Sequence, residues 1–194
     1  NEEKYLRECL LSVKKQMIDV PFEIIVVNNA STDQTGQIAK EEGVILVDES
    51  EKGVGHARAK GLEVARGEIL VYIDADTRLP DGWLQRVENY FKKHPKTAAI
   101  TTDFRFYDGR PTEIIGQRFF NTILMPINNF VMSMVGKPEV LIGQSAALRT
   151  NWLRKAGGIN LDFAFHGEDT SLAYRMHTQG KVKFVSDFYV YTSA

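Results

Sequence analysis

Hydrophobic residues in the first hundred positions follow two alternating patterns. Continuous apolar runs rich in β-branched residues, at 23–28, 44–47 and 69–73, predict strands buried on both faces. Between and after them, apolar residues recur at helical spacing, most clearly behind Pro80. That stripe consists of Trp83, Leu84, Val87, Tyr90 and Phe91. The alternation predicts βαβ units, and therefore an α/β domain with a mixed, mostly parallel sheet flanked by helices.

Three further segments of this half predict helices. Residues Leu6, Cys9, Leu10, Val13 and Met17 fall on one helical face near the start of the chain. Ser31 and Gln34 have the spacing of a capping box, which predicts a helix from there to about Glu42. A loop with glycines opens a helix over 53–66.

The second half of the chain is less regular. Residues 98–107 read as extended, 169–179 as a helix, and 181–185 and 188–191 as strands. The segment 114–135 is long and apolar but is interrupted by asparagines and Pro126. It predicts either a helix packed in the core or a partly exposed apolar patch. We expect a single domain over 1–194.

Composition narrows the class of protein. The chain has 194 residues with 24 Lys and Arg against 25 Asp and Glu, and a formal net charge of -1. This balance argues against nucleic acid as a partner, because bulk electrostatic binding needs a basic excess. A single cysteine, Cys9, excludes an intramolecular disulfide and a cysteine-rich zinc site. No apolar run approaches the roughly 20 residues of a membrane span.

The strongest candidate for chemistry is Asp74-Ala75-Asp76, directly after the predicted strand 69–73. Residues at the carboxyl end of a buried strand line the ligand crevice of such sheets. Two carboxylates there repel each other unless a cation joins them, and Mg²⁺ or Mn²⁺ fits oxygen ligands of this kind. The alternative is an acidic pair that caps the helix near Pro80.

Other candidates are weaker taken singly. Glu168 and Asp169 open the last predicted helix, where acidic residues are often only dipole partners. The loop from Asn28 to Asp33 could contact a ribose or base, or could simply cap its helix. The segment from Lys52 to Arg58 is a glycine-bearing helix entry that suits phosphate, although it lacks the P-loop spacing. The four histidines are scattered along the chain. His166 lies beside Glu168 and could be catalytic, but an exposed loop histidine is the favoured interpretation.

In chain order, these segments form a recognisable set. They are Asn28-Asn-Ala-Ser-Thr-Asp33, Gly53-x-Gly-x-Ala-Arg58, Ile73-Asp-Ala-Asp76, Gly143-Gln-Ser-Ala-Ala-Leu-Arg149 and Gly167-Glu-Asp169. The set resembles the family 2 glycosyltransferases of the GT-A fold, over essentially the whole chain. The resemblance implies transfer of a sugar, with inversion, from a nucleoside diphosphate sugar donor to an acceptor hydroxyl.

The resemblance also implies residue roles. Asp76 would bind Mg or Mn, Asp74 the ribose or the metal shell, and Asp169, with Glu168 beside it, would be the general base. Asn28, Asp33, Lys52, Arg58 and Ala75 would bind the nucleotide sugar. Residues 1–100 would form the nucleotide-sugar half and 101–194 the acceptor half, with Gly143, Gln144 and Ser145 on the acceptor side.

Several positions depart from the family pattern. Asn28 stands where an aspartate is usual, Lys60 replaces an asparagine, and 190–193 lacks the histidine that often joins the metal site. The Gln-x-x-Arg-Trp motif of processive synthases is absent. A sugar nucleotidyltransferase and a non-catalytic nucleotide-sugar-binding module of the same fold are the alternative functions.

The expected partners and context follow from the same resemblance. We expect a glycan or lipid-linked acceptor, a role in cell-envelope polysaccharide or glycolipid synthesis, and a cytoplasmic location with membrane contact through 114–135. The family pattern also places a central strand just before Asn1. We therefore expect a sheet with its first central strand missing, which a fully paired sheet would contradict.

Overall fold

The computed structural model describes residues 1–161 and 167–194. Strands and helices alternate through the first half of the chain, as predicted. The first half comprises α1 (Leu6–Lys14), β1 (Ile25–Asn29), α2 (Thr35–Glu41), β2 (Ile45–Glu49), α3 (Val54–Val64), β3 (Ile69–Ile73) and α4 (Trp83–Lys93). The second half comprises β4 (Thr97–Phe106), α5 (Pro111–Phe119), the π-helix η1 (Phe120–Leu124), α6 (Met125–Met134), β5 (Ser145–Arg149), α7 (Thr150–Lys155), α8 (Glu168–His177) and β6 (Lys181–Thr192).

The strands form two groups. β1 and β2 are parallel, and the other four have the order β3-β5-β4-β6. β4 and β6 are parallel, whereas β5 is antiparallel to both of its neighbours. The α/β class and the mixed sheet are thus confirmed. β5 was not predicted, and the two strands predicted at 181–185 and 188–191 are one strand with a register shift.

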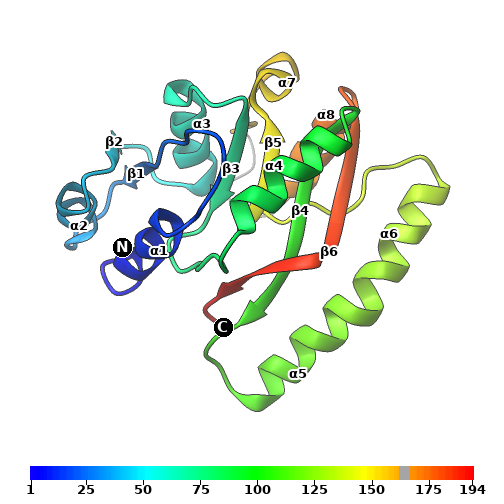
Figure 1. Ribbon diagram of the computed structural model, residues 1–194, viewed down its shortest axis with the longest axis horizontal. Coiled ribbons are helices and arrows are strands. Elements are labelled where there is room, and N and C mark those ends of the chain that lie inside the picture. The colour runs from blue at the N-terminus through cyan, green and yellow to red at the C-terminus, as the bar shows by residue number, and fades with distance from the viewer. Residues whose placement is uncertain (162–166) are drawn as a thin grey trace.

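The two groups of strands are not joined by strand pairing. Among the described residues, β1 pairs only with β2, and β3 pairs with β5 alone. Each of these strands therefore keeps one edge without a strand partner, between the β1–β2 pair and the larger sheet (Figure 1). A fully paired sheet would have contradicted the expectation of a missing central strand, and the described strands do not form one. A segment upstream of Asn1 stays a prediction.

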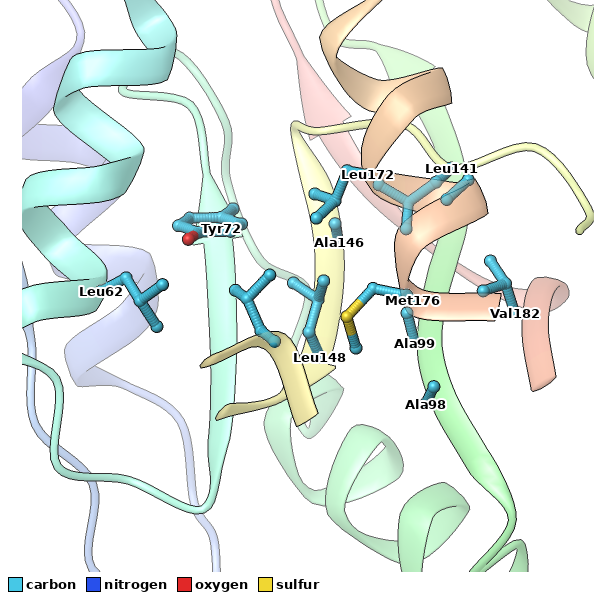
Figure 2. Packing of buried hydrophobic residues seen from close by; sticks show 12 residues of the cluster. Leu62, Tyr72, Ala98, Ala99, Leu141, Ala146, Leu148, Leu172, Met176 and Val182 are labelled. Atoms are coloured by element: carbon cyan, nitrogen blue, oxygen red, sulfur yellow. The ribbon is translucent and has the colours of Figure 1, made fainter. Parts of the chain in front are cut away.

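Helices cover both faces of the larger sheet. Trp83, Val87 and Phe91 of α4 pack with Ile100 and Val190 on one face. On the opposite face, Leu172 and Met176 of α8 belong to one buried cluster with Leu148 of β5, and the cluster extends to Leu62 of α3 (Figure 2). Apolar burial on both faces explains why these strands read as continuous hydrophobic runs.

Two local predictions were wrong. α1 ends at Lys14, and Met17 is 85% exposed rather than part of its buried face. α2 begins at Thr35 and has no Ser31–Gln34 capping box. Gln34 is its N-cap residue, and the Asp33 carboxylate just before it accepts from the Thr35 backbone N–H at 3.1 Å.

The segment 111–134 is one long helical rod made of α5, η1 and α6, set apart from β1 and β2 along the other side of the molecule (Figure 1). Its buried residues are Gln117, Asn121, Met125 and Asn129. A spacing of four overshoots the 3.6-residue turn of an α-helix, and the wider π turn offsets that drift. The helix therefore keeps one mostly polar face toward β4. Among the described residues, no helix is long and apolar enough to cross a membrane.

Candidate active site

The loop after β3 is fixed by backbone hydrogen bonds. The Thr77 N–H donates to the Asp74 carbonyl at 2.9 Å, which closes a turn around Asp74, Ala75 and Asp76. Arg78 then exchanges backbone hydrogen bonds of 2.7 and 3.0 Å with Tyr191 of β6. The two carboxylates are thus carried on a short loop anchored at both ends.

Asp74 and Asp76 are carboxylates in a setting that disfavours their charge. Burial raises the pKa of Asp76, against hydrogen bonds from Thr192 and Thr77 that lower it. Burial also raises the pKa of Asp74; the nearby Arg58 opposes this shift and the charge of Asp76 adds to it. The Thr192 hydroxyl lies 3.3 Å from Oδ1 of Asp76. Oxygen donors of this kind match Mg²⁺ or Mn²⁺.

Within 1–161 and 167–194, no three His, Cys, Asp or Glu side chains are grouped as a metal cage. A cation at Asp74 and Asp76 would therefore need further ligands from a bound molecule or water, which is the usual arrangement for Mg²⁺ with phosphate substrates.

Arg58 of α3 lies at the centre of the site. Its Nη1 donates to Glu168 at 3.0 Å and to Asp169 at 2.8 Å, and its Nη2 lies 3.8 Å from Asp74. Burial opposes the charge of the guanidinium, but Asp169, Glu168 and Asp74 outweigh it, so the pKa of Arg58 is raised. One side chain therefore joins the two acidic motifs, which lie almost a hundred residues apart in sequence.

Gly143 supports the same arrangement from the loop before β5. Its backbone N–H donates to Oδ2 of Asp169 at 2.9 Å, so each carboxylate oxygen of Asp169 has its own donor. A Cβ at position 143 would overlap the Arg58 guanidinium. Only glycine leaves room for this contact.

The loop after β1 is organised mainly by its own hydrogen bonds. Asn28 Nδ2 donates to Asp48 at 2.8 Å, while its Oδ1 is buried and has no partner among the described residues. Asp33 is occupied by Thr35 and the Glu3 N–H, and Lys52 is exposed.

The predicted acceptor-side residues divide into two kinds. Gly143 lies at the site, and Gln144 beside it is partly exposed. Ser145 is fully buried, and its hydroxyl donates to the Thr102 carbonyl at 3.0 Å within the sheet.

His166 lies outside the described residues. Cys9 is buried, and burial raises its thiol pKa to about 12, as befits a core residue.

Two supporting residues were missed in the sequence. Thr192 reaches Asp76 from the end of β6, in the stretch where a histidine was sought. Asn29 binds the β2–α3 loop, since its Nδ2 donates to the Glu49 and Glu51 carbonyls and its Oδ1 accepts from the Gly53 N–H at 2.8 Å. Neither residue carried a signal in the sequence, because both contacts depend on how separate segments meet in the fold.

Solved structures with the same arrangement of elements define the class of fold. The mannosyltransferase PcManGT from Pyrobaculum calidifontis, in complex with GDP-Man and Mn²⁺, matches 100% of this chain and 54% of its own, with a TM-score of 0.71 and 24% identity. TarS residues 1–349 from S. aureus, in complex with UDP, match with a TM-score of 0.75 and 22% identity, over 100% of this chain and 58% of that one. The fold is the GT-A fold of glycosyltransferases.

The family follows from the sequence itself. The model of Glycosyl transferase family 2 matches residues 1–155, so the chain belongs to this family. The putative glycosyltransferase EpsH of Bacillus subtilis is 35% identical over 108 residues, which are 53% of this chain and 29% of EpsH. TarS of Staphylococcus aureus, a poly(ribitol-phosphate) β-N-acetylglucosaminyltransferase, is 33% identical over 103 residues, or 48% of this chain and 18% of TarS. The chain thus spans less than a third of these two curated relatives.

Proposed function

We propose that this chain is the catalytic part of an inverting, metal-assisted glycosyltransferase. It transfers a sugar from a nucleoside diphosphate sugar to an acceptor hydroxyl. The observation that carries the proposal is the junction at Arg58, which gathers Asp74 from one motif and Glu168 and Asp169 from the other. Family membership and relatives named as glycosyltransferases support it.

Asp169 is the proposed general base. Arg58 and the Gly143 N–H each hold one of its oxygens, which fixes the direction of the carboxylate, and its side chain remains 37% exposed. The acceptor oxygen bonds to the anomeric carbon, Asp169 takes its proton, and the bond to the diphosphate oxygen breaks. Inversion results because base and leaving group lie on opposite faces of the sugar. Glu168 holds Arg58 from the other side.

The charge balance of the site favours a divalent cation. Three carboxylates, those of Asp74, Glu168 and Asp169, share the positive charge of Arg58, and the charge of Asp76 acts on Asp74 beside them. A nucleoside diphosphate, itself an anion, would be repelled by this excess. Mg or Mn held by Asp76 and Asp74 would supply the missing positive charge and stabilise the leaving diphosphate. The PcManGT complex with GDP-Man and Mn²⁺ supports this choice.

The donor is proposed to bind between the β1 and β3 loops. The unpartnered Oδ1 of Asn28 is an acceptor that a nucleobase N–H would satisfy. Asp33, Lys52, Arg58 and Ala75 complete the proposed donor site, with Lys52 free to reach a phosphate and Ala75 contributing backbone.

The acceptor is proposed to approach from the second half of the chain. Gln144 would contact it, and Ser145 would act indirectly by fixing the start of β5. A glycan or a lipid-linked sugar of the cell envelope is the expected acceptor, and the cytoplasm the expected location, with residues 114–135 at a membrane.

Replacing Asp169 with Asn tests the base. Asp169→Asn removes the proton acceptor but keeps the shape of the side chain. Turnover of a nucleoside diphosphate sugar with Mn²⁺ should fall at least about 100-fold, the usual contribution of a general base. Calorimetric binding of UDP or GDP should change little. Asp187→Asn is the matched control and should keep full activity, because Asp187 is an exposed residue of β6 that acts on Tyr90 and is not among the charges that shift Arg58.

The result also separates the alternatives. Full activity of Asp169→Asn would contradict the base assignment. Nucleotide binding without turnover by the unmodified protein, across a panel of donors, would favour a non-catalytic module.

A further inference from the structure

The long helix α5–η1–α6 has its polarity reversed. Its buried face carries Gln117, Asn121 and Asn129 with a single apolar residue, Met125. Its exposed apolar residues share the outward side over the whole length, and Phe130 and Met134 are 66% and 72% exposed. The exposed set, here called the outer apolar face, is Ile115, Phe119, Phe120, Ile123, Leu124, Ile127, Phe130, Val131, Met134 and Val135.

The helix is attached through its polar residues. Gln117 Nε2 donates to the Phe104 carbonyl at 2.7 Å, and Asn121 Nδ2 to the same carbonyl at 2.9 Å. Asn129 Oδ1 accepts from the Val140 N–H at 3.0 Å. The outer apolar face is therefore not needed to hold the helix in place, and leaving so many large apolar groups in water is unfavourable.

Along residues 114–138 the charges have one sign, and the flanking Glu113 and Glu139 are paired with Arg110 and Lys183. From Ile114 to Pro138 there is no Asp or Glu, whereas Arg118 and Lys137 are present and exposed.

At the C-terminal end of α6, a groove of about 180 Å³ is lined by Lys137, His177, Lys181 and Lys183 together with Glu139. Glu139 is paired with Lys183, which leaves Lys137 and Lys181, among the described residues, as unneutralised cations at this end of the apolar face. Exposed cations beside an apolar face are the pattern of interfacial helices that bind anionic lipids.

We propose that the outer apolar face docks on an anionic lipid bilayer, with the helix lying in the plane of the surface. One side of the helix is hydrogen-bonded to the protein, so only the outer side is available to the membrane. Its phenylalanines and aliphatic side chains enter the acyl boundary, and Arg118, Lys137 and Lys181 meet lipid phosphates. The inference rests on the membrane contact of 114–135 in the proposed function and deepens it, because it names the side of the helix and the lipid charge; the surface holds none of the proposed catalytic residues.

Co-sedimentation of the purified chain with vesicles tests this proposal. We expect binding to phosphatidylcholine vesicles that contain about 30% phosphatidylglycerol, weaker binding to pure phosphatidylcholine, and loss of the difference at high salt. The double variant Phe130→Glu/Met134→Glu should bind at least about tenfold more weakly. Burial of a single large apolar side chain already changes a binding constant by about tenfold or more.

The chain offers a matched control. Phe22 and Met17 are also exposed, at 43% and 85%, but lie outside the helix. Phe22→Glu/Met17→Glu makes the same chemical change and should keep full vesicle binding. Equal loss in both double variants, or no binding by the unmodified chain, would overturn the proposal.

Two further measurements separate the other outcomes. If a second copy covers this face, light scattering will show a dimer that Phe130→Glu/Met134→Glu dissociates, and vesicle binding will be absent. UDP or GDP binding with Mn²⁺, measured on the same samples, should be equal in both variants. Loss of nucleotide binding with unchanged vesicle binding would contradict the proposed donor site and would still support the proposed membrane surface.

Discussion

Two helices that read alike in sequence are oriented in opposite ways. α4 directs its aromatic and aliphatic residues into the core, where Trp83 and Phe91 are 1% and 2% exposed. The helix α5–η1–α6 directs its amides inward and its aromatic residues outward. The difference lies in what each helix covers: α4 lies on an apolar sheet face, whereas Asp103 and the Phe104 carbonyl of β4 need hydrogen-bond donors. A polar surface selects the polar face of its helix.

The largest expected effect comes from the buried side of this comparison. Phe91→Ala would leave a cavity in the core and lower the free energy of unfolding by about 3–5 kcal/mol. Urea denaturation followed by circular dichroism measures it. A loss below about 1 kcal/mol would mean that α4 is not the core helix described here.

An intermediate effect is expected at the polar attachment. Asn121→Ala removes one donor from the Asp103 carboxylate and one from Phe104 O, which keeps its bond from Gln117. The change should cost about 1–3 kcal/mol, mainly because a hydrogen bond to a charged group is lost. The same denaturation assay applies, with Asn128→Ala on the same helix as the control. If both variants behave alike, the inward amides do not attach the helix.

The smallest effect is expected on the outer apolar face. Phe130→Ala makes the same change as Phe91→Ala at a side chain that is 66% exposed, so its unfolding free energy should stay within about 0.5 kcal/mol of the unmodified chain. A loss comparable to that of Phe91→Ala would show that the face is covered by protein.

The first half of the fold was predictable because its strands are buried on both faces and its apolar runs are continuous. β5 was missed because it is only five residues long and reads Ser-Ala-Ala-Leu-Arg, with small residues that carry little strand signal. The orientation of 114–135 was open, since hydrophobic periodicity tells which residues share a face and not which face is inside.

The candidate site also has parts that the sequence predicts and parts that it does not. The two acidic motifs could be found from their positions at a strand end and a helix start. Their junction through Arg58 and Gly143 could not, because it joins four separate segments of the chain. The position of Thr192 at Asp76 likewise depends on the long pairing of β6 with β4 and on the bridge to Arg78.

The π turn at η1 has a consequence for aligning relatives. Such a turn accommodates one residue more than an α-helical turn does, so the separation of twelve residues between Gln117 and Asn129 covers about three turns, as a separation of about eleven would in a regular helix. A homologue with one residue fewer between these two amides could keep both on the same side. A single-residue gap at this point in an alignment therefore marks a change of helical pitch and not the loss of the surface.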